Sequence, residues 1–112
     1  MKITTTEQDD ISIIEIEGDI DSKTASQFEA GAKEAATKHT KIAINLTAVE
    51  YMSSAGLRVL LMVYRNIKAE NGRVVLVGVS EEIQDVMSTT GFINFFTIVA
   101  TLEEALTILK NA

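Results

Sequence analysis

Residues 41–79, KIAINLTAVEYMSSAGLRVLLMVYRNIKAENGRVVLVGV, contain the pattern that decides the fold. The segment opens with alternating apolar residues, which is typical of a strand with one buried face. Near Ser53 or Ser54 the period becomes that of an amphipathic helix, which we expect to run to about Glu70 and to stop at an Asn-Gly pair. The nearly continuous apolar run RVVLVGV then indicates a strand covered on both faces. This order predicts a right-handed crossover between two parallel strands.

The rest of the chain continues the alternation of strands and helices. Further strands are expected at residues 2–6, 11–17 and 95–100, and further helices at about 23–38, 80–89 and from 101 onward. Asp21 or Ser22 is expected to cap the first helix, and Thr101 with Glu104 forms a capping-box pattern before the last one. The resulting order β-β-α-β-α-β-α-β-α predicts one α/β domain over residues 1–112, with a mixed sheet of four to five strands and about four helices.

Composition narrows the classes of function. Sixteen acidic residues against ten basic ones give a formal net charge of −6, which disfavours nucleic acid and anionic membranes as partners. The chain has no cysteine and a single histidine, so no metal site is expected. The N-terminal MKITTTEQDD does not resemble a signal peptide, and no apolar run has the length of a membrane span. We expect a cytoplasmic monomer that binds a protein or a small molecule.

Two adjacent serines, Ser53 and Ser54, stand where the central helix begins. A serine there can cap the helix, bind an anion, act as a nucleophile or accept a phosphate. Catalysis is disfavoured because a nucleophilic serine needs a nearby base, and the only histidine, His39, lies in a polar stretch elsewhere. The GxSxG pattern of hydrolases and the glycine patterns of phosphate-binding loops are also absent. We therefore expect no enzyme activity, no catalytic residues and no cofactor.

The helical period places Ser54 at the head of an outward stripe. Arg58, Leu61 and Arg65 follow it at helical spacing, and Met62 lies beside them. Such a stripe is either solvated surface or a contact surface for a protein. If the strands at residues 11–17 and 41–46 are neighbours in the sheet, their carboxyl ends also bring Asp21 near Ser54, whereas Asp19 is interpreted as a turn residue.

These residues resemble a known family. The run INLTAVEYMSSAGLRVLL is similar to the signature of STAS-domain proteins, specifically the bacterial anti-sigma factor antagonists. GDID at residues 18–21, NGRVVLVGV at 71–79 and GFINFF at 91–96 resemble further family motifs, so the likeness covers nearly the whole chain.

The resemblance implies a role for each residue of the motif. It places the phosphoacceptor serine at Ser54, the motif glycine at Gly56 and the acid near the phosphorylation pocket at Asp21. The family's Asp before the phosphoserine is Ser53 here, which makes Ser53 a competing acceptor, and the Ser or Thr after it is Ala55. Together with the outward stripe, the expected partner-binding residues are Asp21, Ser53, Ser54, Ala55, Gly56, Arg58, Leu61, Met62 and Arg65.

The resemblance also implies a switch between partners. The unphosphorylated chain would bind an anti-sigma factor that is also a serine kinase of the histidine-kinase-like ATPase fold, and would thereby release a sigma factor. Phosphorylation of Ser54 would end that binding, and a metal-dependent serine phosphatase would restore it. The resemblance leaves open one alternative, a STAS adaptor subunit without phosphorylation, for example in lipid transport. A further alternative is a nucleotide-binding domain, which the acidic charge and missing phosphate loop disfavour.

Overall fold

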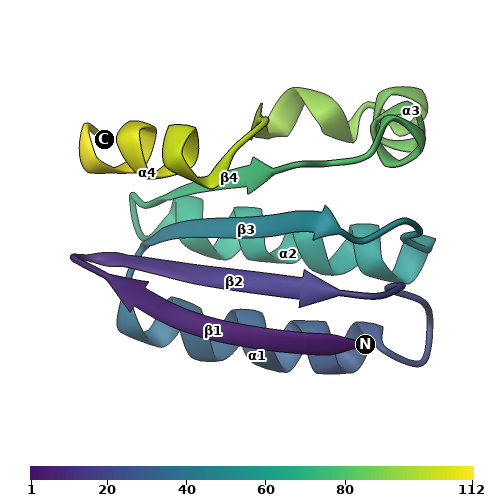
Figure 1. Cartoon of the computed structure of the whole chain (residues 1–112), viewed down its shortest axis with the longest axis horizontal. Coiled ribbons are helices and arrows are strands. Elements are labelled where there is room, and N and C mark those ends of the chain that lie inside the picture. Colours follow the sequence, from purple (N-terminus) through teal and green to yellow (C-terminus); the bar gives the residue numbers. More distant parts are fainter.

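Five strands form one mixed sheet in the order β1-β2-β3-β4-β5 in the computed structural model, which describes residues 1–112 (Figure 1). The strands are β1 (Lys2–Gln8), β2 (Ile11–Glu17), β3 (Lys41–Ala48), β4 (Arg73–Val77) and β5 (Thr97–Val99). β1 pairs antiparallel with β2, and the other three pairings are parallel. The predicted mixed sheet and the order β-β-α-β-α-β-α-β-α are confirmed.

Four α-helices and one 3-10 turn connect and cover the strands. The helices are α1 (Ala25–Lys38), α2 (Ser54–Ala69), α3 (Glu81–Thr90) and α4 (Leu102–Lys110), with the 3-10 turn η1 at Phe92–Phe95. The predicted helix starts after Ser53, Ser80 and Thr101 are confirmed, since each of these hydroxyls accepts a hydrogen bond from a backbone N–H of the first turn. None of the helices has both the length and the apolar content needed to cross a bilayer.

The two faces of the sheet pack against different helices. Alternation along β3 turns Ile42 and Ile44 toward a core that includes buried residues of α1, α2 and α3, whereas Ala43 belongs to a smaller core under α4. In Figure 1, α1 and α2 run side by side behind the strands, and α4 lies at the other side of the sheet. This layering places the N-terminus of α2 at the carboxyl edge of the parallel strands.

The start of α1 differs from the prediction. The helix begins at Ala25 rather than near Lys23, and Thr24 occupies the N-cap position without a side-chain cap. The Asp21 carboxylate instead accepts hydrogen bonds from the N–H groups of Lys23 and Thr24, at 2.9 and 3.0 Å. Asp residues often close such turns by bonding to the backbone two or three residues on, and this local bonding competes with helix formation. Asp21 therefore orders the turn before the helix, and Ser22 is exposed.

The bounds of four strands also shift. β1 extends to Gln8 rather than residue 6, and β3 extends to Ala48 rather than residue 46. β4 ends at Val77 rather than continuing through residue 79, because Gly78 takes a left-handed φ of 65°. β5 is shorter than the predicted 95–100, because the preceding residues form the 3-10 turn η1. None of these shifts moves the start of α2, so the site there is unaffected.

Candidate functional site

The carboxyl ends of β2 and β3 build the site around the start of α2. After β2 the chain returns to pair with the segment beyond β3, where Ile20 and Met52 form an isolated parallel bridge. The Ile20 N–H donates to the Tyr51 carbonyl at 3.0 Å, and the Ser53 N–H donates to the Ile20 carbonyl at 2.8 Å. The predicted neighbourhood of Asp21 and the serine pair therefore follows from main-chain hydrogen bonds across the sheet edge.

The two serines occupy different environments. Ser53 is half-buried, and its hydroxyl oxygen accepts a hydrogen bond of 3.4 Å from the Gly56 N–H, so it is the N-cap of α2. Ser54 is the first residue of the helix, is exposed, and has no side-chain hydrogen bond within the chain. Capping thus occupies Ser53 and leaves the Ser54 hydroxyl free toward solvent.

The outward stripe of α2 is partly exposed and positively charged. Arg58 and Arg65 are exposed, and neither belongs to any of the four ion pairs of the chain. Leu61 and Met62 are half-buried beside them. Met62 also packs against the main core and lines a cavity between α1 and α2, so only part of its side chain faces outward.

Ala55 and Gly56 face inward rather than outward. Ala55 is half-buried and packs against the main core, and Gly56 is buried. A Cβ at Gly56 would lie 2.6 Å from Met52 Cγ and 2.8 Å from Ile20 Cγ2, closer than real Cβ atoms approach their neighbours. Of the expected binding residues, these two therefore support the site from beneath: the glycine lets α2 start directly above the Ile20–Met52 bridge.

Asp21 supplies fixed negative charge beside the serines. The backbone N–H of Thr24, followed by that of Lys23, donates to its carboxylate and holds the pKa of Asp21 below its ordinary value of 3.8. The residue is therefore ionised at neutral pH. No group of three or more His, Cys, Asp or Glu side chains is arranged to hold a metal ion anywhere in the chain.

Sequence reasoning missed three features of this region. Val59, which the outward stripe does not include, is 7% exposed and belongs to the main core. Tyr64 is half-buried, and its ring packs against Phe95 and Phe96 with centroids 5.5 Å apart. Tyr51 is 54% exposed directly next to the site. The exposure of Tyr51 could have been predicted from the alternation of side chains before the helix. Because Met52 points inward, the preceding Tyr51 points outward.

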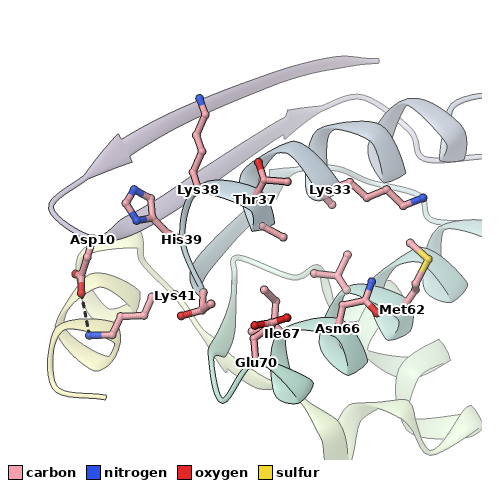
Figure 2. Close-up of a pocket in the computed structure, with 14 residues that line it drawn as sticks. Asp10, Lys33, Thr37, Lys38, His39, Lys41, Met62, Asn66, Ile67 and Glu70 are labelled. Carbon is pink, nitrogen blue, oxygen red and sulfur yellow. Dashed lines mark ion pairs between the residues drawn. The ribbon is translucent and has the colours of Figure 1, made fainter.

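One cavity lies away from the serines. About 790 Å³ in volume, it opens between the C-terminal halves of α1 and α2, with Thr37 and His39 on one side and Asn66 on the other (Figure 2). At its far end Lys41 forms an ion pair of 3.3 Å with Asp10. The cavity lies beside the C-terminal half of α2, from Met62 onward, whereas the serine site lies at the N-terminus of that helix.

The STAS family model matches residues 2–105, and the chain belongs to this family. It is 30% identical over 113 residues to BtrV of Bordetella bronchiseptica, whose name assigns it to the anti-sigma factor antagonists; the alignment covers 100% of this chain and 97% of BtrV.

Solved structures agree with this family. An anti-sigma factor antagonist from Mycobacterium paratuberculosis aligns with a TM-score of 0.87 at 27% identity, over 97% of this chain and 93% of that one. The antagonist SpoIIAA in its unphosphorylated form gives 0.80 at 23% identity, over 99% and 100% of the two chains. Bacillus SpoIIAA in its phosphorylated form gives 0.75 at 24% identity, over 95% and 97%. At these lower identities the likeness to SpoIIAA shows a shared fold.

Proposed function

We propose that this chain is an anti-sigma factor antagonist whose binding is switched off by phosphorylation of Ser54. Unmodified, it binds an anti-sigma factor that is also a serine kinase of the histidine-kinase-like ATPase fold, and so frees a sigma factor. It acts as a binding module rather than as an enzyme. The exposed, unbonded hydroxyl of Ser54 on the first turn of α2 is the observation that carries the proposal, and the name of BtrV supports the class of partner.

Ser54 is a better acceptor than its neighbour. The Ser53 oxygen already accepts a backbone hydrogen bond, and its residue is half-buried. To reach a kinase, that oxygen would first have to leave the Gly56 N–H, and the loss of a serine cap costs about 1 kcal/mol of helix stability. No such contact opposes modification of Ser54. The structure therefore favours Ser54 over Ser53 as the site of transfer.

Phosphorylation of Ser54 is compatible with the native fold. A phosphate adds about −1.5 to −2 charges. At the N-terminus of α2 the helix dipole favours that charge by roughly 0.3–1 kcal/mol. Arg58 lies one turn further along, exposed and without an ion pair, and is available to the phosphate. The domain is therefore expected to keep its structure when modified.

The switch then acts at the docking surface. A dianion held in the contact must lose its hydration when the partner binds, which costs several kcal/mol unless the partner compensates it. Each ~1.4 kcal/mol weakens binding about tenfold. A metal-dependent serine phosphatase would reverse the modification.

Incubation with the ATPase-fold kinase encoded nearest to this chain, ATP and Mg²⁺ tests the proposal. Peptide mass spectrometry is expected to place one phosphate on Ser54 in the wild type, none in Ser54→Ala, and one in the matched variant Ser53→Ala. Addition of the phosphatase is expected to remove it. If an active kinase that binds the chain modifies neither serine, the switch is refuted and the chain is a constitutive STAS adaptor.

A further inference from the structure

Tyr51 is the most exposed of the large apolar side chains. It is 54% exposed, whereas the other two exposed ones are Phe95, at 48%, and Val86, at 44%. Phe95 packs its ring against Tyr64 on the far part of α2, and Val86 lies on α3. Tyr51 alone among the three lies within a few residues of Ser54.

The backbone holds the Tyr51 side chain in an outward position. Its carbonyl accepts the Ile20 N–H, and the next residue, Met52, is 5% exposed and bridged to Ile20. Two residues on, the Ser53 N–H donates to the Ile20 carbonyl. Because successive side chains of an extended segment point to opposite sides, the inward Met52 directs Tyr51 toward solvent. An aromatic ring displayed from a hydrogen-bonded backbone loses little conformational freedom when a partner covers it.

We propose that Tyr51 is the apolar anchor of the docking surface, and that its ring enters an apolar pocket on the anti-sigma factor. This inference rests on the proposed function and adds a residue to it. Buried Tyr side chains dominate the binding energy of many protein interfaces, where a rim of weaker contacts excludes water. Here Arg58 and Arg65, which form no ion pair within the chain, belong to that rim. A complementary partner surface therefore has an apolar pocket for Tyr51 and acidic groups that face these two arginines.

This arrangement places the phosphate inside the contact. Along the chain, Ser54 stands between Tyr51 on one side and the Arg58–Arg65 stripe on the other. A phosphate on Ser54 faces the acidic groups of the partner and attracts Arg58 away from them. The modification therefore weakens the charged contacts while it prevents the partner from closing over the ring of Tyr51.

Calorimetric titration of the purified kinase with unphosphorylated protein tests the anchor. Tyr51→Ala is expected to weaken binding at least about 30-fold, the loss typical of a central aromatic contact. Tyr51→Phe keeps the ring and is expected to bind within about threefold of the wild type. Val86→Ala removes a comparably exposed apolar group on α3 and is the matched control, with no expected change. All three variants are expected to unfold thermally at the wild-type temperature, because neither side chain is buried.

The possible results distinguish failure of the Tyr51 anchor from failure of the proposed function. If the wild type does not bind the kinase at all, the proposed function is refuted, and the anchor with it. If the wild type binds and Tyr51→Ala binds equally well, the anchor alone is refuted. If Tyr51→Phe loses as much affinity for the kinase as Tyr51→Ala, the claim that the contact is apolar is refuted. If Val86→Ala loses as much affinity as Tyr51→Ala, the claim that the contact is centred on Tyr51 is refuted.

Discussion

Replacement of Gly56 with alanine tests the packing beneath the start of α2. The added Cβ would lie 2.6 Å from Met52 Cγ and 2.8 Å from Ile20 Cγ2. Both side chains are buried, at 5% and 0% exposure, so they have little room to move away. Overpacking of this kind costs about 1–3 kcal/mol. Alanine regains up to about 1 kcal/mol because it is the better helix former.

The expected net effect of Gly56→Ala is a loss of roughly 0–3 kcal/mol in the free energy of unfolding. For a domain of this size each kcal/mol lowers the melting temperature by about 4 °C. Urea and thermal unfolding followed by circular dichroism measure both quantities. The same preparations also report whether kinase binding survives, since the start of α2 has to shift to accept the methyl group.

A matched substitution separates packing from helix propensity. Gly31 lies within α1, and a Cβ there would meet only the flexible side chain of Ile3. Gly31→Ala is therefore expected to leave stability unchanged or to raise it by up to about 1 kcal/mol. If Gly56→Ala proves as stable as Gly31→Ala, the close approach of α2 to the Ile20–Met52 bridge is not the reason for the glycine, and the reasoning fails.

Three further outcomes follow from hydrogen bonds. Ser53→Ala loses the cap of α2 and is expected to lower the free energy of unfolding by about 0.5–1 kcal/mol in urea titrations, while Ser54→Ala stays at the wild-type value; equal losses would contradict the cap assignment. The N–H donors of Thr24 and Lys23 lower the pKa of Asp21 in the folded protein, so the ionised carboxylate stabilises the fold. This contribution to the free energy of unfolding is complete above the ordinary pKa of 3.8 and is lost as the pH falls through the lower pKa of the folded state. Asp21→Asn should therefore flatten the acid decline of stability, and an unchanged decline would show that the turn does not depend on the charge. Ser12→Ala removes the hydroxyl that donates to the Ala35 carbonyl at 3.1 Å from a fully buried position and is expected to cost about 1 kcal/mol by thermal unfolding, a value that a neutral variant would contradict.

The fold was readable from the sequence where local patterns and packing agree. The alternation of Ile42, Ile44 and Leu46 predicts one buried face of β3, and all three are fully buried. The cap at Thr101 was also predictable, because its pattern with Glu104 involves only the first turn of the helix. The order of elements then predicts the parallel neighbours that bring Asp21 to the serine pair.

The missed features depend on contacts between distant segments. The observed start of α1 follows from the hydrogen bonds that the Asp21 carboxylate accepts within the preceding turn. These bonds compete with the first turn of the helix, and the spacing of apolar residues does not reveal them. Met62 appears on the outer stripe of an isolated helix, but the presence of α1 turns part of it into the wall of a cavity. Tyr64 likewise gains its partners from the 3-10 turn that replaces the start of the predicted last strand.

The affinity of the kinase for Ser54-phosphorylated protein, measured beside that for unmodified protein, is the most direct test of the proposed switch. Both forms are expected to give the same far-UV spectrum and melting behaviour, since the helix N-terminus accepts the charge. The phosphorylated form is expected to bind at least about 30-fold more weakly, the equivalent of ~2 kcal/mol. Equal affinity of the two forms, with phosphate located on Ser54, would contradict the account.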